Sequence, residues 1–171
     1  SLPELRLHNG TIYRWNRPVY DISHGVPHLR VENRLLAAGP TVADTISNAA
    51  FWFGLVRQLA ENERPLWSQM SFSAAEENFQ AAAYAGFDAD VYWPGVGQVR
   101  ASELVLRRLL PMADAGLTSW GASAAERDRY LGIIEQRCLK AQGGAEWFVS
   151  RMRARSGQDR CDALRATLIE Y

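Results

Sequence analysis

Residues 49–56 read Ala-Ala-Phe-Trp-Phe-Gly-Leu-Val, a stretch without a charged side chain. Upstream of it, Thr41 and Asp44 are three positions apart, the spacing of a side-chain pair that caps the first turn of a helix. A helix that is apolar on every side is buried, because it has no polar face to present to water. We therefore expect a helix that begins after Pro40 and forms the centre of the core.

Downstream of this helix the pattern stays helical. The tetrapeptide Ser-Ala-Ala-Glu begins at Ser73 and again at Ser123, and each copy predicts a capping box that is closed by Glu76 or Glu126. Glycines near residue 86 and at 143–144 are expected to end these two helices. The remaining expected helices span 102–115, which Pro111 should kink or end, 145–155 and 159–169.

Upstream of residue 40, residues 11–21 and 28–36 have the pattern of strands. Both segments are rich in aromatic and other strand-favouring residues, and their polar and apolar positions alternate. Residues 21–27 (DISHGVP) contain turn-forming residues and are expected to join the strands as an antiparallel pair. The predicted class is α+β within one domain, residues 1–171. A small antiparallel sheet fragment over 1–38 precedes a mainly helical bundle over 41–171.

The composition sets limits on function. The chain has 171 residues, with 19 basic and 19 acidic side chains and no net charge. It therefore lacks the overall positive charge that is typical of nucleic-acid-binding proteins. No apolar stretch approaches the length of a membrane span, and two cysteines cannot build a disulfide framework. We expect a cytoplasmic protein that binds neither nucleic acid nor membrane.

The segment 28–36 carries the residues best suited to chemistry. Side chains alternate along a strand, so one face presents His28, Arg30, Glu32 and Arg34. Burying four ionisable groups in an apolar core would be costly, so this face must meet water or a polar cleft. Arginines in such a row can bind a carboxylate or a phosphate through two hydrogen bonds. If the first strand pairs with it, the same surface also receives Thr11, Tyr13, Trp15 and Arg17.

A second interpretation of this row is purely structural. Charged residues often follow one solvent-exposed face of an antiparallel sheet. Glu32, Arg34 and Arg17 would then form a cross-strand salt bridge, and the two arginines would neutralise the carboxylate unless a metal also bound it. The residues alone leave both interpretations open.

A family resemblance favours the first interpretation. The run from His8 (HNGTIYRWNRP), the following PHLRVENR, the Gly-Pro link and the helical segment NAAFWFGL together resemble the glutamate–cysteine ligase superfamily. They are most similar to its second family (GCS2) and to the related bacterial carboxylate–amine ligases. In that family a first strand ending in an element such as Arg17-Pro18 precedes a strand with Glu-x-Arg, here Glu32-Asn33-Arg34. The helix around Glu77-Asn78 also resembles one in the family.

The resemblance implies an enzyme that uses ATP to form an acyl phosphate and then joins an amine to a carboxylate. It also implies a glutamine-synthetase-like catalytic fold, whose sheet forms one wall of a cleft for ATP, Mg²⁺ and an acidic amino-acid substrate. By residue match, Glu32 would bind Mg²⁺, Arg34 would neutralise the transferring phosphoryl group, and Arg17 would hold phosphate or substrate carboxylate. The residues expected to contact the substrate are Arg30, His28 and Asn78, with His8 as a further candidate.

Two departures from the family pattern bear on activity. Where the family helix often has a basic residue, this chain has Ala83 and Tyr84. Magnesium sites in these enzymes also need carboxylates from earlier strands, which are not recognisable in this sequence. We therefore expect the C-terminal part of a longer ligase, which fits the first residue, Ser1; it would work with the remainder of its own chain and be inactive alone. The competing hypothesis is a non-catalytic binding or interaction domain that keeps the ligase-like fold.

Three further features favour structural interpretations. Residues 92–97 (YWPGVG) are expected to form a turn whose aromatic rings pack on the bundle, with a binding loop as the alternative. Cys138 and Cys161 are expected to be small buried residues. A solvated helix face is expected to carry Arg151, Arg153, Arg155 and Arg160.

Overall fold

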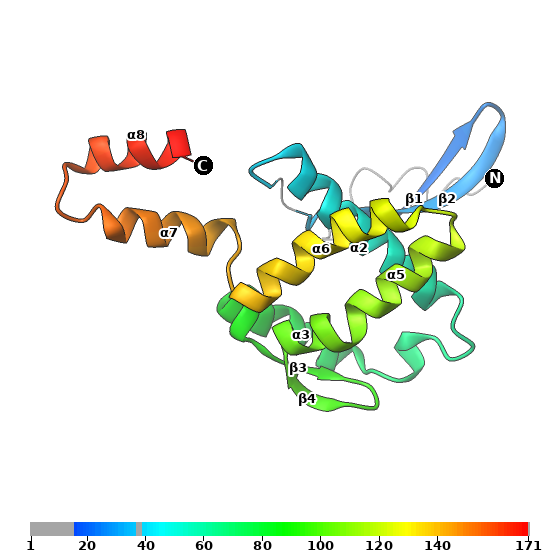
Figure 1. Cartoon of the computed structure of the whole chain (residues 1–171). Helices are drawn as coiled ribbons and strands as arrows, with labels where there is room; N and C mark the ends of the chain where they lie inside the picture. The colour runs from blue at the N-terminus through cyan, green and yellow to red at the C-terminus, as the bar shows by residue number, and fades with distance from the viewer. Residues whose placement is uncertain (1–15, 37–38, 171) are drawn as a thin grey trace. The chain divides into compact units, whose positions relative to one another are not determined.

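The computed structural model describes residues 16–36 and 39–170, and it is a mixed α+β structure, as predicted (Figure 1). The chain divides into two compact units, residues 1–37 and residues 38–171. The described part of the first unit is one β-hairpin, and the second unit contains the helices and a further small hairpin. The division falls where the sequence changes from a strand pattern to a helical pattern.

The hairpin of the first unit is made of strands β1 (Asn16–Ser23) and β2 (Val26–Asn33), which pair antiparallel as predicted. His24 and Gly25 connect the strands, and both have positive φ angles, 50° and 79°. Positive φ at both central residues is the pattern of a type I′ turn, whose twist matches that of the flanking strands. Because two residues suffice to reverse the chain, the turn is shorter than the predicted segment 21–27.

The second unit is assembled around a central group of helices. Its helices are α2 (Val42–Ala60), α3 (Phe72–Ala85), α4 (Ala101–Leu104), α5 (Leu110–Ser119), α6 (Ala124–Lys140), α7 (Gly144–Ala154) and α8 (Arg160–Glu170). Shorter turns are the 3-10 helices η1 (Leu66–Ser68) and η2 (Gly86–Asp88) and the π-helix η3 (Val105–Leu109). Helix α2 packs against α5 and α6 (Figure 1), and the core there includes the buried Ala113, Leu131 and Ile134.

Helix α2 begins where the sequence predicts. The Thr41 hydroxyl accepts the backbone N–H of Asp44, and the Asp44 carboxylate accepts the backbone N–H of Thr41, which confirms this capping box. The expectation that the helix is buried on every side is wrong, because Phe53 and Val56 remain 46% and 41% exposed. Helices α5 and α6 cover only part of its circumference.

Glycines allow α2 and α5 to approach each other closely. A β-carbon at Gly54 would lie 2.3 Å from the carbonyl oxygen of Ala113, and one at Gly116 would lie 2.0 Å from the carbonyl oxygen of Gly54. Both distances are much shorter than a van der Waals contact between carbon and oxygen. Only glycine therefore permits this backbone-to-backbone packing, which leaves Ala113 with no exposed surface.

The helix predicted at 102–115 continues through its proline. Helical backbone runs from α4 through the π-helix η3 into α5, and Pro111 lies at the start of α5. Proline lacks an N–H group, and its ring collides with the carbonyl of the preceding turn in a regular α-helix. The wider π turn directly before Pro111 relieves this conflict, so the helix does not end there.

Of the two predicted Ser-Ala-Ala-Glu capping boxes, one forms. Ser123 and Glu126 exchange the expected hydrogen bonds at the start of α6. The box predicted at Ser73 is wrong, because Ser71 caps α3 by accepting the backbone N–H of Ala74. A serine two positions earlier thus takes the capping role and places Ser73 inside the first turn.

A second hairpin occurs where the sequence predicted a turn. Strands β3 (Asp90–Trp93) and β4 (Gly97–Arg100) pair antiparallel around the Pro-Gly pair. Trp93 packs against the buried cluster that includes Leu104, which confirms the predicted packing of this ring on the bundle. The mainly helical second unit therefore contains a small sheet that was not predicted.

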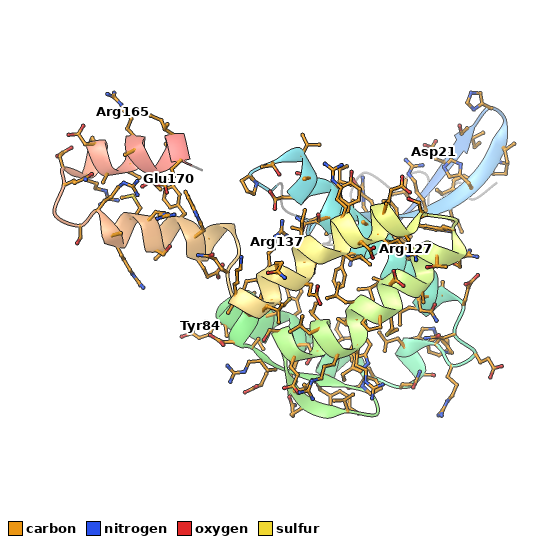
Figure 2. All side chains as sticks on the ribbon, viewed as in Figure 1. Asp21, Tyr84, Arg127, Arg137, Arg165 and Glu170 are labelled. Carbon is orange, nitrogen blue, oxygen red and sulfur yellow. The ribbon has the colours of Figure 1, made fainter. Side chains whose placement is uncertain are left out.

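Helices α7 and α8 form a helical hairpin, each within one residue of its predicted span. Arg151 of α7 and Arg155, which directly follows that helix, both bind the carboxylate of Glu170 in α8, with N–O distances of 3.0 and 2.5 Å. Figure 2 shows Glu170 between these two helices, whereas Arg165 points away from α7. The predicted solvated arginine face is thus partly an ion-pair network.

Candidate functional site

The predicted polar row lies on one face of the β1–β2 hairpin. Directly opposed residues of an antiparallel pair share a face. Three opposed pairs build this row: Arg17 with Glu32, Val19 with Arg30, and Asp21 with His28. Strand β2 ends at Asn33, so Arg34 follows the strand directly instead of lying within it as predicted.

Two arginines converge on the carboxylate of Glu32. Arg17 donates from Nε to Oε2 of Glu32, and Nη2 of Arg34 lies 3.1 Å from the same oxygen. The Glu32 side chain keeps 39% of its surface exposed, whereas those of Arg17 and Arg34 keep 16% and 24%. The hydrogen bond from Arg17, followed by that from Arg34, lowers the pKa of Glu32 below its usual value. The carboxylate is therefore ionised and accessible, and the guanidinium groups are held in place by it.

A second cluster lies further along the same face, toward the turn. Nη1 of Arg30 donates to Oδ2 of Asp21 at 3.0 Å and lies 2.9 Å from Nε2 of His28. The backbone N–H of Ile22 donates to the other oxygen of Asp21 at 2.8 Å and fixes the carboxylate, which Figure 2 labels on the hairpin. The hydrogen bond from Arg30 is the main cause of the lowered pKa of Asp21.

The sequence did not identify Asp21 as part of the site, because the residue was assigned to the turn. Its position could have been found from the register, since a two-residue turn at His24 and Gly25 places Asp21 opposite His28. The described face then has three guanidinium groups and two carboxylates. It has a net positive charge when His28 is neutral, which favours anions.

The described residues do not form a metal site by themselves. Within 16–36 and 39–170, no three His, Cys, Asp or Glu side chains are grouped so that they could hold a metal ion. Glu32 would supply one carboxylate, and that group already accepts hydrogen bonds from two arginines. Magnesium is usually bound by one or two carboxylates together with substrate phosphates and water. What this face can do by itself is bind and neutralise anionic groups through arginine.

Asn78, predicted to contact substrate, belongs to the helical unit and holds α3 to β3. Its Nδ2 donates to the carbonyl oxygen of Tyr92 at 2.8 Å, and its Oδ1 accepts the backbone N–H of Tyr92 at 2.7 Å. The side-chain amide thus mimics a strand partner for one residue of β3. These contacts give Asn78 a structural role at the second hairpin.

The remaining candidates are placed as follows. His8, Thr11, Tyr13 and Trp15 lie outside the described residues. Cys138 is buried as predicted, and its burial raises the pKa of the thiol, whereas the prediction that Cys161 is buried is wrong because it is exposed near the start of α8.

A polar network in the helical unit was not predicted. Arg137 of α6, which Figure 2 labels, donates to Oδ1 of Asn48 at 2.7 Å and to Oδ1 of Asp44 at 2.6 Å, both in α2. Burial raises the pKa of Asp44, but the hydrogen bonds from Thr41 and Arg137 outweigh it, so this pKa lies below its usual value. Only the fold brings these groups together, because Asp44 and Arg137 are 93 residues apart in sequence.

Two open grooves flank α6, with volumes of about 530 and 540 Å³. Both are lined in part by Asp128, Gly132 and Glu135. Each groove also contains arginine, so neither presents one sign of charge to a ligand.

Searches of protein families, curated proteins and solved structures gave no match to this chain. Across the part of the chain that the structure describes, no helix is both long and apolar enough to cross a membrane.

Proposed function

We propose that the chain is part of an ATP-dependent carboxylate–amine ligase of the glutamate–cysteine ligase type, with a glutamine-synthetase-like fold. The β1–β2 hairpin would form the wall of the active site that binds anionic groups of the substrates. The observation that supports this best is the net positive charge of the row, in which three guanidinium groups outnumber two carboxylates.

The roles of the residues follow from their contacts. Arg17 and Arg34 are mostly buried and oriented by Glu32, so their positive charges are fixed along the row, where they would stabilise a bound phosphoryl group. Arg30 and His28, nearer the turn, would bind the carboxylate of an amino-acid substrate. Phosphoryl transfer depends mainly on positioning and charge neutralisation, which are the properties of such a row. ATP and Mg²⁺ belong to this proposal, but no step is assigned to a metal, since the described residues do not group three metal-ligating side chains.

The test is release of phosphate from ATP by the natural gene product, with Mg²⁺ and a panel of amino acids. We expect release that depends on an amino-acid pair and is lost in Glu32→Ala, while the isolated chain shows none. Arg100→Ala is the matched control, because Arg100 also pairs with a carboxylate on a hairpin, that of Asp88 at 2.7 Å, but lies away from the row in sequence. Equal activity of a folded Glu32→Ala protein and the wild type would contradict the proposal.

One observation favours the competing hypothesis of a non-catalytic interaction domain. The carboxylates of Glu32 and Asp21 are already engaged by arginines of the same hairpin, as in a purely structural salt-bridge network. In that case the gene product would fold and bind a partner but would release no phosphate with any amino acid. Glu32→Ala would then change only the stability of the hairpin.

A further inference from the structure

The contact between Arg30 and His28 constrains the protonation of the imidazole. The distance from Nη1 of Arg30 to Nε2 of His28 is 2.9 Å. A guanidinium group has donors and no acceptor, so Nε2 of His28 must be the acceptor in this hydrogen bond. The arrangement therefore requires neutral His28 with its proton on Nδ1.

Protonation of His28 removes that acceptor and introduces a like charge beside Arg30. The charged groups that face His28 from the described hairpin are Arg30 on its own strand and Asp21, which lies directly opposite on β1. The Arg17–Glu32 pair lies further along the row. An imidazolium would be repelled by Arg30 and attracted by Asp21, the carboxylate that Arg30 now holds.

We propose that His28 is a proton-controlled switch that releases Arg30 to bind an oxyanion. When His28 is neutral, Arg30 is held by Asp21 and His28, and the carboxylate of Asp21 occupies the place of a ligand. When His28 is protonated, it takes Asp21 as its partner and the guanidinium of Arg30 turns to an external carboxylate, phosphate or sulfate. The side chains of Arg30 and Asp21 are 50% and 54% exposed, so such a ligand can reach them.

This inference rests on the proposed function, because it assigns regulation to the same anion-binding face. Protonation adds a positive charge to an imidazole, so the state of the switch is set by pH. Anions would then bind more tightly to this end of the row in acid than in base.

The experiment is a titration of the 171-residue chain with sulfate, whose charge is constant between about pH 5.5 and 8. Binding is followed by NMR through the side-chain signals of Arg30, at fixed ionic strength. We expect the dissociation constant to be about two- to fivefold lower at the acid end, the range for one exposed ion contact. His28→Gln should remove this pH dependence, whereas His24→Gln, in the turn of the same hairpin, should keep it.

Asp21→Asn provides a second measurement, because it frees Arg30 at every pH. It should bind sulfate at pH 8 more tightly than the wild type does. A wild-type dissociation constant that does not change with pH, or a pH dependence that survives His28→Gln, would overturn the proposal. Neither outcome decides the proposed function, because that proposal is tested by phosphate release from ATP and by its loss in Glu32→Ala.

Discussion

Replacing Gly116 by alanine probes the packing on which the helical unit depends. The new β-carbon would lie 2.0 Å from the carbonyl oxygen of Gly54, 2.8 Å from its carbonyl carbon and 3.2 Å from the backbone nitrogen of Gln58. All three neighbours are backbone atoms, which cannot move aside as the end of a side chain could. Helix α5 must therefore shift away from α2, and the shift disturbs the contacts of the buried Ala113.

The magnitude follows from two opposing terms. Alanine favours a helix interior over glycine by about 0.5–1 kcal/mol. Overpacking a well-packed core costs about 1–3 kcal/mol, and a clash with backbone belongs at the upper end of this range. We expect a net destabilisation of about 2 kcal/mol, which corresponds to a fall in Tm of about 4–8 °C.

Gly132→Ala is the matched control. Gly132 also lies inside a helix, α6, but a β-carbon there meets no atom within 4 Å. Only the preference of a helix interior for alanine over glycine then applies, and we expect the free energy of unfolding to rise by about 0.5–1 kcal/mol. Thermal unfolding followed by circular dichroism at the helix band measures both variants. A Gly116→Ala protein with a Tm equal to or above that of the wild type would refute the close approach of α2 and α5.

Two further predictions concern helix starts and ion pairs. Ser123→Ala should lower the free energy of unfolding by about 0.5–2 kcal/mol, because it removes the cap of α6. Ser73→Ala should leave the free energy of unfolding nearly unchanged, because Ser71 caps α3. Urea unfolding measures both variants, and equal losses would contradict the assigned caps. Arg137→Ala should cost about 1–3 kcal/mol at pH 7, because it leaves the half-buried Asp44 carboxylate without its arginine. Since the folded-state pKa of Asp44 is lowered, its contribution is present at neutral pH and is lost as the pH falls through that pKa. The loss caused by Arg137→Ala should therefore be smaller near pH 3, and an equal loss at both pH values would contradict this assignment.

Local sequence patterns predicted the elements that depend on neighbouring residues. The alternation along 28–36 predicted a strand and its polar face, and the spacings of Thr41 with Asp44 and of Ser123 with Glu126 predicted two helix starts. These signals work because strand faces and helix caps are formed by residues that are close in the chain. The contact of Arg17 and Arg34 with Glu32 could also be expected, once antiparallel pairing was assumed.

Features that depend on distant residues could not be predicted in this way. The short β3–β4 hairpin is stabilised by Asn78, fourteen residues before Tyr92, and its strands are too short to show a period. The π turn that lets the helix pass through Pro111 also has no local sequence signal.

The sequence by itself determined which residues of this protein form a strand with an ionisable face and where two of its helices begin. The tertiary structure decided how those residues are used. It pairs Asp21 with Arg30, places Arg137 against Asp44 and brings Gly54 to Gly116. The physical reason is that capping and strand alternation are local, whereas these contacts exist only after strands and helices have packed. An ion pair or a close backbone approach contributes nothing to the stability of the fold until folding has brought both partners together.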